Sequence, residues 1–115
     1  MSISIYGIKN CDTMKKAMTW LNDHNIEYTF HDYKKSGLPA QLADEWLTHI
    51  ELEHLINKRG TTWRKLDDEV KNNLNKTSAK EIMMENTSVI KRPLLNVNGQ
   101  YHLGFKPEQY QEIFN

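Results

Sequence analysis

The chain has 115 residues, of which 38% are hydrophobic and 26% are charged, and these values are typical of one globular domain with a hydrophobic core. Basic and acidic residues number 15 each, so no net charge draws the chain to nucleic acid or to a membrane surface. Residues 1–4 lack the basic start of a signal peptide, and no apolar run is long enough to span a membrane, so we expect a cytoplasmic protein.

The start of the chain predicts a β-α-β unit. Residues 3–6 form a short apolar strand, and a helix begins near Asp12 and ends near His24. The residues expected on the buried face of this helix recur at helical spacing: Met14, Ala17, Met18 and Leu21. A second strand is indicated by apolar residues that alternate with polar ones: Ile26, Tyr28 and Phe30. Strands joined in this way by one helix run parallel to each other.

The middle of the chain predicts a helical insertion at about residues 38–88. Residues 34–37 are predicted to form a loop, and Pro39 marks the first turn of a helix. Ser78 and Glu81 have the spacing of a capping box, in which each side chain bonds the backbone of the other residue. We therefore expect another helix that starts at Ser78 and ends near Asn86.

The end of the chain predicts a β-hairpin and a final helix. Asn98 and Gly99 lie between two strand-like segments, and this pair suits a type I′ turn because both residues adopt positive φ. Pro107 starts the last helix. The order β-α-β, helical insertion, β-β-α predicts an α/β protein with a thioredoxin-like fold, a mixed four-stranded sheet and a single domain over residues 1–115.

Cys11 is the only cysteine and the candidate catalytic nucleophile. It follows the first strand and precedes the first helix, so it lies beyond the carboxyl end of a parallel strand, where open α/β sheets place their sites. The unpaired N–H groups of a helix start favour a thiolate over a thiol, and Lys9 adds a positive charge two residues upstream. The alternative is a small buried apolar side chain, which is the commoner role of a lone cysteine.

The chain has no second thiol that could resolve an oxidised Cys11. Met14 stands where a C-x-x-C motif has its second cysteine, and methionine cannot form a disulfide. An oxidised intermediate must therefore be resolved by a thiol from another molecule. No bound cofactor is expected, and no metal site is predicted because the spacing of the histidines does not match a zinc site.

Two basic clusters are candidate anion sites. Lys58 and Arg59 form one, and Arg92, between Lys91 and Pro93, belongs to the other. An arginine fork matches the geometry of an oxyanion, and the bond between Arg92 and the proline that follows it can be cis. A solvated surface is the alternative for either Lys-Arg pair.

Three motifs together resemble the arsenate reductase (ArsC) family, and most closely its YffB branch, to which the regulator Spx is also related. The motifs are residues 5–14, 57–66 and 90–94. The resemblance implies a thioredoxin-like domain, a catalytic role for Cys11, anion-binding arginines near the second and third motifs, and a cis proline at Pro93. The residues that we assign to substrate or anion binding are Lys9, Asn10, Lys58, Arg59, Arg92 and Pro93.

The resemblance implies a glutathione-dependent monothiol oxidoreductase, in which Cys11 attacks a mixed disulfide or a small oxyanion. Glutathione or another external thiol then resolves the adduct. Gly7 stands where glutaredoxin-linked arsenate reductases have a histidine, and Asn57 stands where they have an arginine. Their last arginine falls near Phe105 and Lys106, so we do not expect arsenate itself to be the substrate. The alternative function is an Spx-like regulator, whose protein partner is RNA polymerase and which turns over no substrate.

Overall fold

The computed structural model describes residues 2–115, and the contacts between residues divide the chain into two units. The sheet unit consists of residues 2–35 and 92–115, and the helical unit consists of residues 36–91. The chain leaves the sheet unit within the short helix α2 (Tyr33–Ser36) and returns to it at Arg92. Cys11 and Arg92 therefore belong to the same unit.

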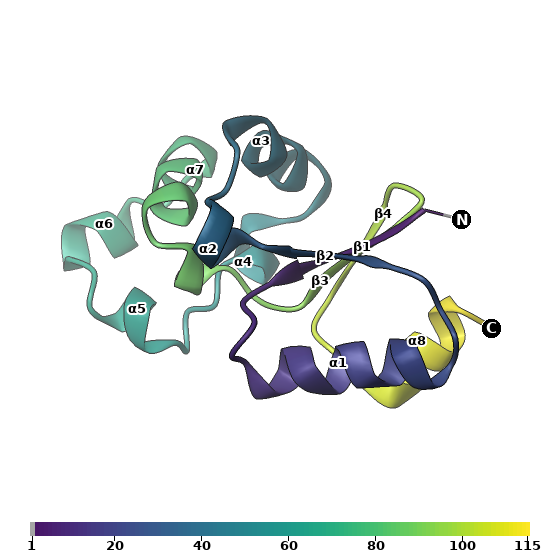
Figure 1. The fold of residues 1–115 in the computed structure, drawn as a ribbon. Coiled ribbons are helices and arrows are strands. Elements are labelled where there is room, and N and C mark those ends of the chain that lie inside the picture. Colours follow the sequence, from purple (N-terminus) through teal and green to yellow (C-terminus); the bar gives the residue numbers. More distant parts are fainter. Residues whose placement is uncertain (1) are drawn as a thin grey trace. The chain divides into compact units, whose positions relative to one another are not determined.

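A mixed sheet of four strands forms the centre of the sheet unit (Figure 1). The strands are β1 (Ile3–Gly7), β2 (Thr29–Asp32), β3 (Leu94–Val97) and β4 (Gln100–Leu103). Their order across the sheet is β2-β1-β3-β4. Strand β1 runs parallel to β2 and antiparallel to β3, and β3 runs antiparallel to β4. The predicted mixed four-stranded sheet and its parallel first pair are confirmed.

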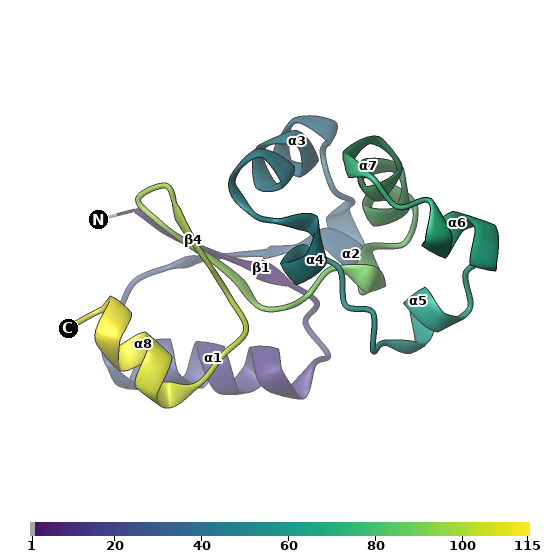
Figure 2. The same ribbon diagram turned by 180° about the vertical axis from the view of Figure 1, so that it is seen from behind.

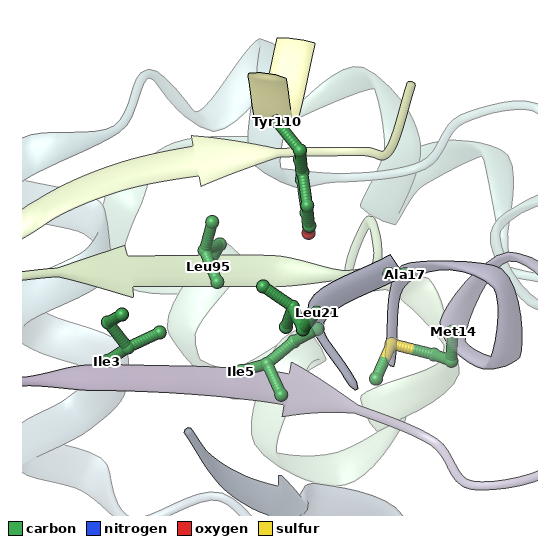
Figure 3. Close-up of a cluster of buried hydrophobic side chains, with 7 residues drawn as sticks. All are labelled: Ile3, Ile5, Met14, Ala17, Leu21, Leu95 and Tyr110. Carbon is green, nitrogen blue, oxygen red and sulfur yellow. The ribbon is translucent and has the colours of Figure 1, made fainter. Parts of the chain in front are cut away.

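Two helices cover one face of this sheet. Helices α1 (Asp12–Asp23) and α8 (Pro107–Ile113) lie side by side beneath the strands (Figure 1 and Figure 2). The buried cluster between these helices and the sheet is drawn in Figure 3 and consists of Ile3, Ile5, Met14, Ala17, Leu21, Leu95 and Tyr110. The predicted buried face of α1 is therefore confirmed, except that Met18 is only half-buried.

The turn between β3 and β4 has the predicted geometry. Asn98 and Gly99 both have positive φ, 53° and 90°, as a type I′ turn requires. The Asn96 side chain accepts a hydrogen bond from the Gly99 N–H at 2.7 Å, which supports the turn. Pro107 is the first residue of α8, where its missing N–H removes no helical hydrogen bond, so the predicted helix start is also confirmed.

The second strand begins later than the alternation of apolar residues predicts. Asn25 has positive φ (56°), and the Ile26 N–H donates a hydrogen bond to the Leu21 carbonyl at 3.0 Å. The backbone of Ile26 therefore completes the end of α1 instead of joining the sheet, and β2 starts at Thr29. Ile26 and Tyr28 still pack against the core, which explains why their spacing imitates a strand.

The predicted loop at residues 34–37 is wrong for residues 34–36, because residues 33–36 form the helical turn α2, whereas Gly37 lies outside the helix as predicted. The Asp32 carboxylate causes this difference. Its Oδ1 atom accepts hydrogen bonds from the backbone N–H groups of Lys34 and Lys35, each at 3.0 Å, and so satisfies donors that a helix start leaves without partners. An aspartate just before a helical turn is a common cap, and the two lysines that follow it gave no sequence signal of a helix.

The helical unit is built from α3 (Ala40–His49), α4 (Leu52–Leu55), α5 (Thr61–Arg64), α6 (Asp68–Asn72), α7 (Lys76–Glu85) and the 3-10 turn η1 (Thr87–Val89). Helix α3 packs against α7, and the Lys80 Nζ atom lies 3.0 Å from Asp44 Oδ1 between them. Pro39 directly precedes α3 as its N-cap residue, and α6 was not expected from the sequence. Each helix of residues 2–115 falls short of the length and hydrophobicity that a membrane crossing requires.

Helix α7 starts before the predicted Ser78. Asn75 is the N-cap residue, and its side chain accepts a hydrogen bond from the Ser78 N–H at 2.9 Å. In return, the Ser78 hydroxyl accepts a hydrogen bond from the Asn75 N–H at 3.0 Å. Ser78 therefore occupies the third helical position of the capping box and not its first, so the predicted pairing with Glu81 is wrong, whereas the predicted end of the helix at Asn86 is confirmed.

A short β-bridge joins two distant segments of the helical unit. Ile56 pairs with Ile90, the Asn57 N–H donates to the Val89 carbonyl at 2.7 Å, and the Lys91 N–H donates to the Leu55 carbonyl at 2.8 Å. The basic cluster that begins after Asn57 is thereby fixed next to Lys91.

Candidate functional site

Cys11 is the N-cap residue of α1, and its backbone is extended, with φ −130° and ψ 126°. Its carbonyl accepts a hydrogen bond from the Lys15 N–H at 3.0 Å, whereas its side chain makes no capping hydrogen bond. Cys11 is half-buried and packs against the core. The residue is therefore held at the positive end of a 12-residue helix with part of its surface open to solvent.

Asp32 connects the segment that carries Cys11 to the end of the neighbouring strand. Gly7 and Asp32 are register partners in the parallel pair of β1 and β2, so both strands end at the same edge of the sheet. The Asp32 Oδ2 atom accepts a hydrogen bond from the Lys9 N–H at 3.2 Å. Because the other carboxylate oxygen caps α2, this one side chain fixes the backbone before Cys11 against the start of α2.

Tyr33, the residue after Asp32, joins two of the predicted site residues. Its side chain is 2% exposed, and the Arg92 guanidinium donates a hydrogen bond to its hydroxyl oxygen. The same phenol interacts electrostatically with Cys11. Burial raises the pKa of Tyr33 above its usual value, and the charge and hydrogen bond of Arg92 only partly offset this rise. The phenol is therefore neutral at physiological pH.

Arg92 reaches this edge of the sheet from the third strand. Leu94, two residues later, is the register partner of Tyr6, so the start of β3 lies beside the end of β1. The Arg92–Pro93 bond is cis, as the resemblance implies. Pro93 is buried, and its carbonyl accepts a hydrogen bond from the Gly104 N–H at 2.9 Å, which anchors the backbone next to Arg92.

Lys9 and Asn10 precede Cys11, and both side chains are exposed. The Lys9 N–H donates a hydrogen bond to Asp32, which is a positioning contact, and the effect of the Lys9 charge on the thiol stays a prediction. Two of the predicted site residues, Cys11 and Arg92, are grouped in the sheet unit, because both interact with Tyr33.

Lys58 and Arg59 belong to the helical unit, where they line a pocket of about 440 Å³. The residues that line this pocket are Glu53, His54, Ile56, Asn57, Lys58, Arg59 and Lys91. The Lys58 Nζ atom lies 2.8 Å from Glu53 Oε2 and 5.6 Å from the centre of the Trp63 ring, so its charge is partly compensated. Arg59 and Lys91 have exposed side chains and give the pocket its positive character.

Sequence reasoning missed Tyr33 and Asp32, although a signal for both was present. The rule that placed Cys11 in the site is that sites lie beyond the carboxyl ends of parallel strands. The same rule applied to the second strand points to residues 32 and 33, but the misplaced strand and the predicted loop at residues 34–37 obscured it. Within residues 2–115, no three side chains of histidine, cysteine, aspartate or glutamate are grouped in a way that could hold a metal ion.

Comparison with known proteins places this geometry in a family. The model of the ArsC family matches residues 6–113. An ArsC-related protein from Brucella melitensis is 53% identical, with a TM-score of 0.81 over 100% of this chain and 96% of that one. A solved YffB protein is 43% identical, with a TM-score of 0.91 over 96% of this chain and 97% of that one.

A more distant relative is a regulator. The global transcriptional regulator Spx of Streptococcus mutans is 25% identical over 109 residues, which cover 93% of this chain and 79% of that protein. These relatives confirm the predicted thioredoxin-like α/β fold and the resemblance on which it was based. The chain is a member of the ArsC family.

Proposed function

We propose that the protein is a glutathione-dependent monothiol oxidoreductase that reduces mixed disulfides at Cys11. The observation that supports this proposal best is the grouping of Cys11, Tyr33 and Arg92 at one edge of the sheet. The half-buried cysteine lies at a helix start, and a cation is bonded to a phenol that interacts with it. Such a setting favours a thiolate nucleophile that remains accessible to a substrate.

The reaction needs two successive thiol–disulfide exchanges. In the first, the Cys11 thiolate attacks the glutathione sulfur of a mixed disulfide, a new disulfide forms between Cys11 and glutathione, and the other partner leaves as a thiolate that takes up a proton. In the second, a glutathione thiolate attacks the glutathione sulfur bound to Cys11, and Cys11 leaves as a thiolate. The mixed disulfide gains two electrons, and two glutathione units leave as one glutathione disulfide.

The cationic residues have proposed roles in binding the substrate. Glutathione carries two carboxylates, and an arginine can bind a carboxylate with two parallel hydrogen bonds. We assign a substrate carboxylate to Arg92 in the sheet unit. In the helical unit, Lys58 and Arg59 form a second candidate anion site in their own pocket. Lys9 and Asn10 contribute exposed surface before the nucleophile, and buried Pro93 supports Arg92 through the backbone.

The space next to Gly7 supports a sulfur substrate over arsenate. A Cβ atom on Gly7 would overlap the Met14 thioether sulfur, so Met14 occupies the volume that a side chain at this position needs. The resemblance places the histidine of glutaredoxin-linked arsenate reductases at residue 7, and in this chain a side chain there would have to displace Met14.

The test is turnover of a panel of glutathione mixed disulfides, with the glutathione disulfide that forms measured by glutathione reductase and NADPH. We expect turnover by the wild type, none by Cys11→Ser, and a raised KM for Arg92→Gln and Arg59→Gln. Arg64→Gln is the matched control, because Arg64 is an exposed arginine outside both groups. After treatment with oxidised glutathione, intact-mass analysis should show one adduct that Cys11→Ser lacks. Failure of every substrate to turn over would contradict the proposal.

The similarity to Spx supports a second candidate function, a regulator that binds RNA polymerase without turnover. The two candidates differ in how they depend on Cys11. A regulator of this kind should bind purified RNA polymerase in both the wild-type and the Cys11→Ser form, with no turnover by either. Binding to the polymerase that survives loss of the thiol, together with inactivity on mixed disulfides, would favour the regulator.

A further inference from the structure

Tyr33 has a fixed place at the edge of the sheet where Cys11 lies. It follows the last residue of β2, whose register partner is the last residue of β1, four residues before Cys11. The Asp32 carboxylate accepts a hydrogen bond from the Lys34 N–H, just after Tyr33, at 3.0 Å. It also accepts one from the Lys9 N–H, in the segment before Cys11, at 3.2 Å. With 2% of its side chain exposed, Tyr33 has little freedom to move.

The hydroxyl of Tyr33 meets Arg92, which comes from a distant part of the chain. Arg92 is half-buried and donates a hydrogen bond to the phenol oxygen. A long arginine side chain loses considerable conformational entropy when it is held in one rotamer, so a buried acceptor that fixes it has a structural effect. Tyr33 is a suitable acceptor because its own backbone is already fixed.

The phenol also differs from a carboxylate in the charge that it adds near the thiol. Burial raises the pKa of Tyr33, so the hydroxyl stays neutral where a carboxylate would be ionised. A carboxylate bonded to Arg92 would neutralise the guanidinium and would repel a thiolate nearby. A neutral acceptor holds the arginine in place and adds no negative charge of its own beside the guanidinium.

We propose that Tyr33 is a positioning residue for the thiol chemistry, because its hydroxyl holds the Arg92 guanidinium where this cation stabilises negative charge on the Cys11 sulfur. The inference rests on the proposed function and adds to it a residue that acts through Arg92. Negative charge lies on the Cys11 sulfur before it attacks the mixed disulfide, and it returns to that sulfur when glutathione displaces it. Tyr33 therefore assists both exchanges without giving up its proton.

The test is the rate of alkylation of Cys11 by iodoacetamide across a pH series, followed by intact mass, in the wild type, Tyr33→Phe, Arg92→Gln and the double variant. Tyr33→Phe should lower the rate at neutral pH by roughly tenfold, the lower end of what a hydrogen bond to a charged group contributes. Its pH profile should move to the alkaline side, and its rate should approach that of the wild type at high pH. Arg92→Gln should act in the same way.

The double variant separates positioning from a general structural role. If Tyr33 acts through Arg92, the double variant should be no slower than Arg92→Gln alone. Tyr28→Phe, which removes the hydroxyl of a half-buried tyrosine elsewhere in the sheet unit, should leave the profile unchanged. A profile of Tyr33→Phe that superimposes on that of the wild type, or an effect that adds fully to Arg92→Gln, overturns the proposal.

A measurement on the wild type covers the case in which Tyr33→Phe does not fold. The NMR ring resonances of Tyr33 should shift as Cys11 titrates, and this step should be absent in Cys11→Ser. A folded wild type without the step contradicts the proposal. Alkylation requires no glutathione, so the two proposals can fail separately. If the alkylation effects are seen but no mixed disulfide is turned over, only the proposed function is contradicted. If mixed disulfides are turned over but the alkylation effects are absent, only the role of Tyr33 is contradicted.

Discussion

Gly7 and Met14 pack so closely that a Cβ atom on Gly7 would overlap the Met14 thioether sulfur. Gly7 ends β1, and Met14 lies in the first turn of α1 with none of its side chain exposed. Both are positions that the sequence motifs single out, because Met14 stands where a C-x-x-C motif has its second cysteine and Gly7 stands four residues before Cys11. Gly7 precedes Cys11 and Met14 follows it, and the structure brings the two residues into one packing contact.

The contact predicts that Gly7→Ala destabilises the fold. An added methyl group must displace the Met14 side chain, and overpacking of this kind lowers the free energy of unfolding by about 1–3 kcal/mol. Urea denaturation followed by circular dichroism measures this loss. In the double variant Gly7→Ala, Met14→Ala the overlap is relieved, so its loss should be smaller than the sum of the two single losses. Additive losses would contradict the close contact.

The order of the elements follows from local signals in the sequence, because each signal depends on the backbone conformation of the residues that carry it. The period of α1, the Asn98–Gly99 turn and Pro107 all agree with the structure. The elements that were predicted wrongly are those in which backbone N–H groups donate hydrogen bonds to a side chain or to the end of a helix. Ile26 bonds to the end of α1 instead of to a strand, and Asp32 turns a predicted loop into a helix.

The candidate site was predictable in part for a related reason. Cys11 is predicted because a single strand-to-helix junction identifies it, and Arg92 is predicted because it precedes a proline in one of the three motifs that carry the resemblance. Tyr33 joins them only through the register of three strands, which comes from pairings between distant residues. No spacing in the sequence reports that the phenol of the residue after β2 meets the arginine two residues before β3.

Asp32 provides a second prediction, in which two substitutions remove different parts of its hydrogen bonding. Asp32→Ala removes the cap of α2 and the contact with the Lys9 N–H, and should cost about 1–2 kcal/mol of unfolding free energy, as loss of an N-cap side chain does. Asp32→Asn keeps one oxygen to cap α2, so it should cost less. Thermal denaturation compares the two, and equal losses would show that the cap of α2 contributes nothing.

Loss of the contact between Asp32 and Lys9 should also be visible near Cys11. Amide hydrogen exchange of Lys9 should become faster in both variants, because asparagine presents an NH₂ group where the second carboxylate oxygen accepts this hydrogen bond. Exchange of Lys35 should become faster in Asp32→Ala alone. Unchanged protection of Lys9 in Asp32→Asn would contradict this assignment of the two oxygens.

His102 predicts a pH dependence of stability. Burial lowers the pKa of His102 below its usual value of 6.5, so the folded state disfavours the charged imidazole. The unfolded chain then binds more protons as pH falls through 6.5, and the free energy of unfolding decreases from there down to the lower pKa of the folded state. Denaturation across a pH series should show this decrease in the wild type, and His102→Gln should lack the part due to this group. A steeper decrease in the variant would contradict the assignment.

Tyr110 predicts a stabilising substitution. Its hydroxyl is buried in the core of the sheet unit, points into the cluster of apolar side chains (Figure 3) and has no hydrogen-bond partner among residues 2–115. A buried hydroxyl that gives up water without a replacement lowers stability, so Tyr110→Phe should raise the free energy of unfolding by about 1 kcal/mol. Tyr28→Phe, at a half-buried tyrosine, should give no comparable gain.

The effect of Tyr110→Phe should grow in alkaline solution. Burial raises the pKa of Tyr110 above its usual value of 10.0, so the folded state keeps the phenol protonated while the unfolded chain ionises it. This difference leaves stability unaffected below pH 10.0 and lowers it as pH rises beyond that value. Phenylalanine has no proton to lose, so the two stability curves should diverge there. Parallel curves, or a variant less stable than the wild type at neutral pH, would show that the hydroxyl is solvated or bonded within the core.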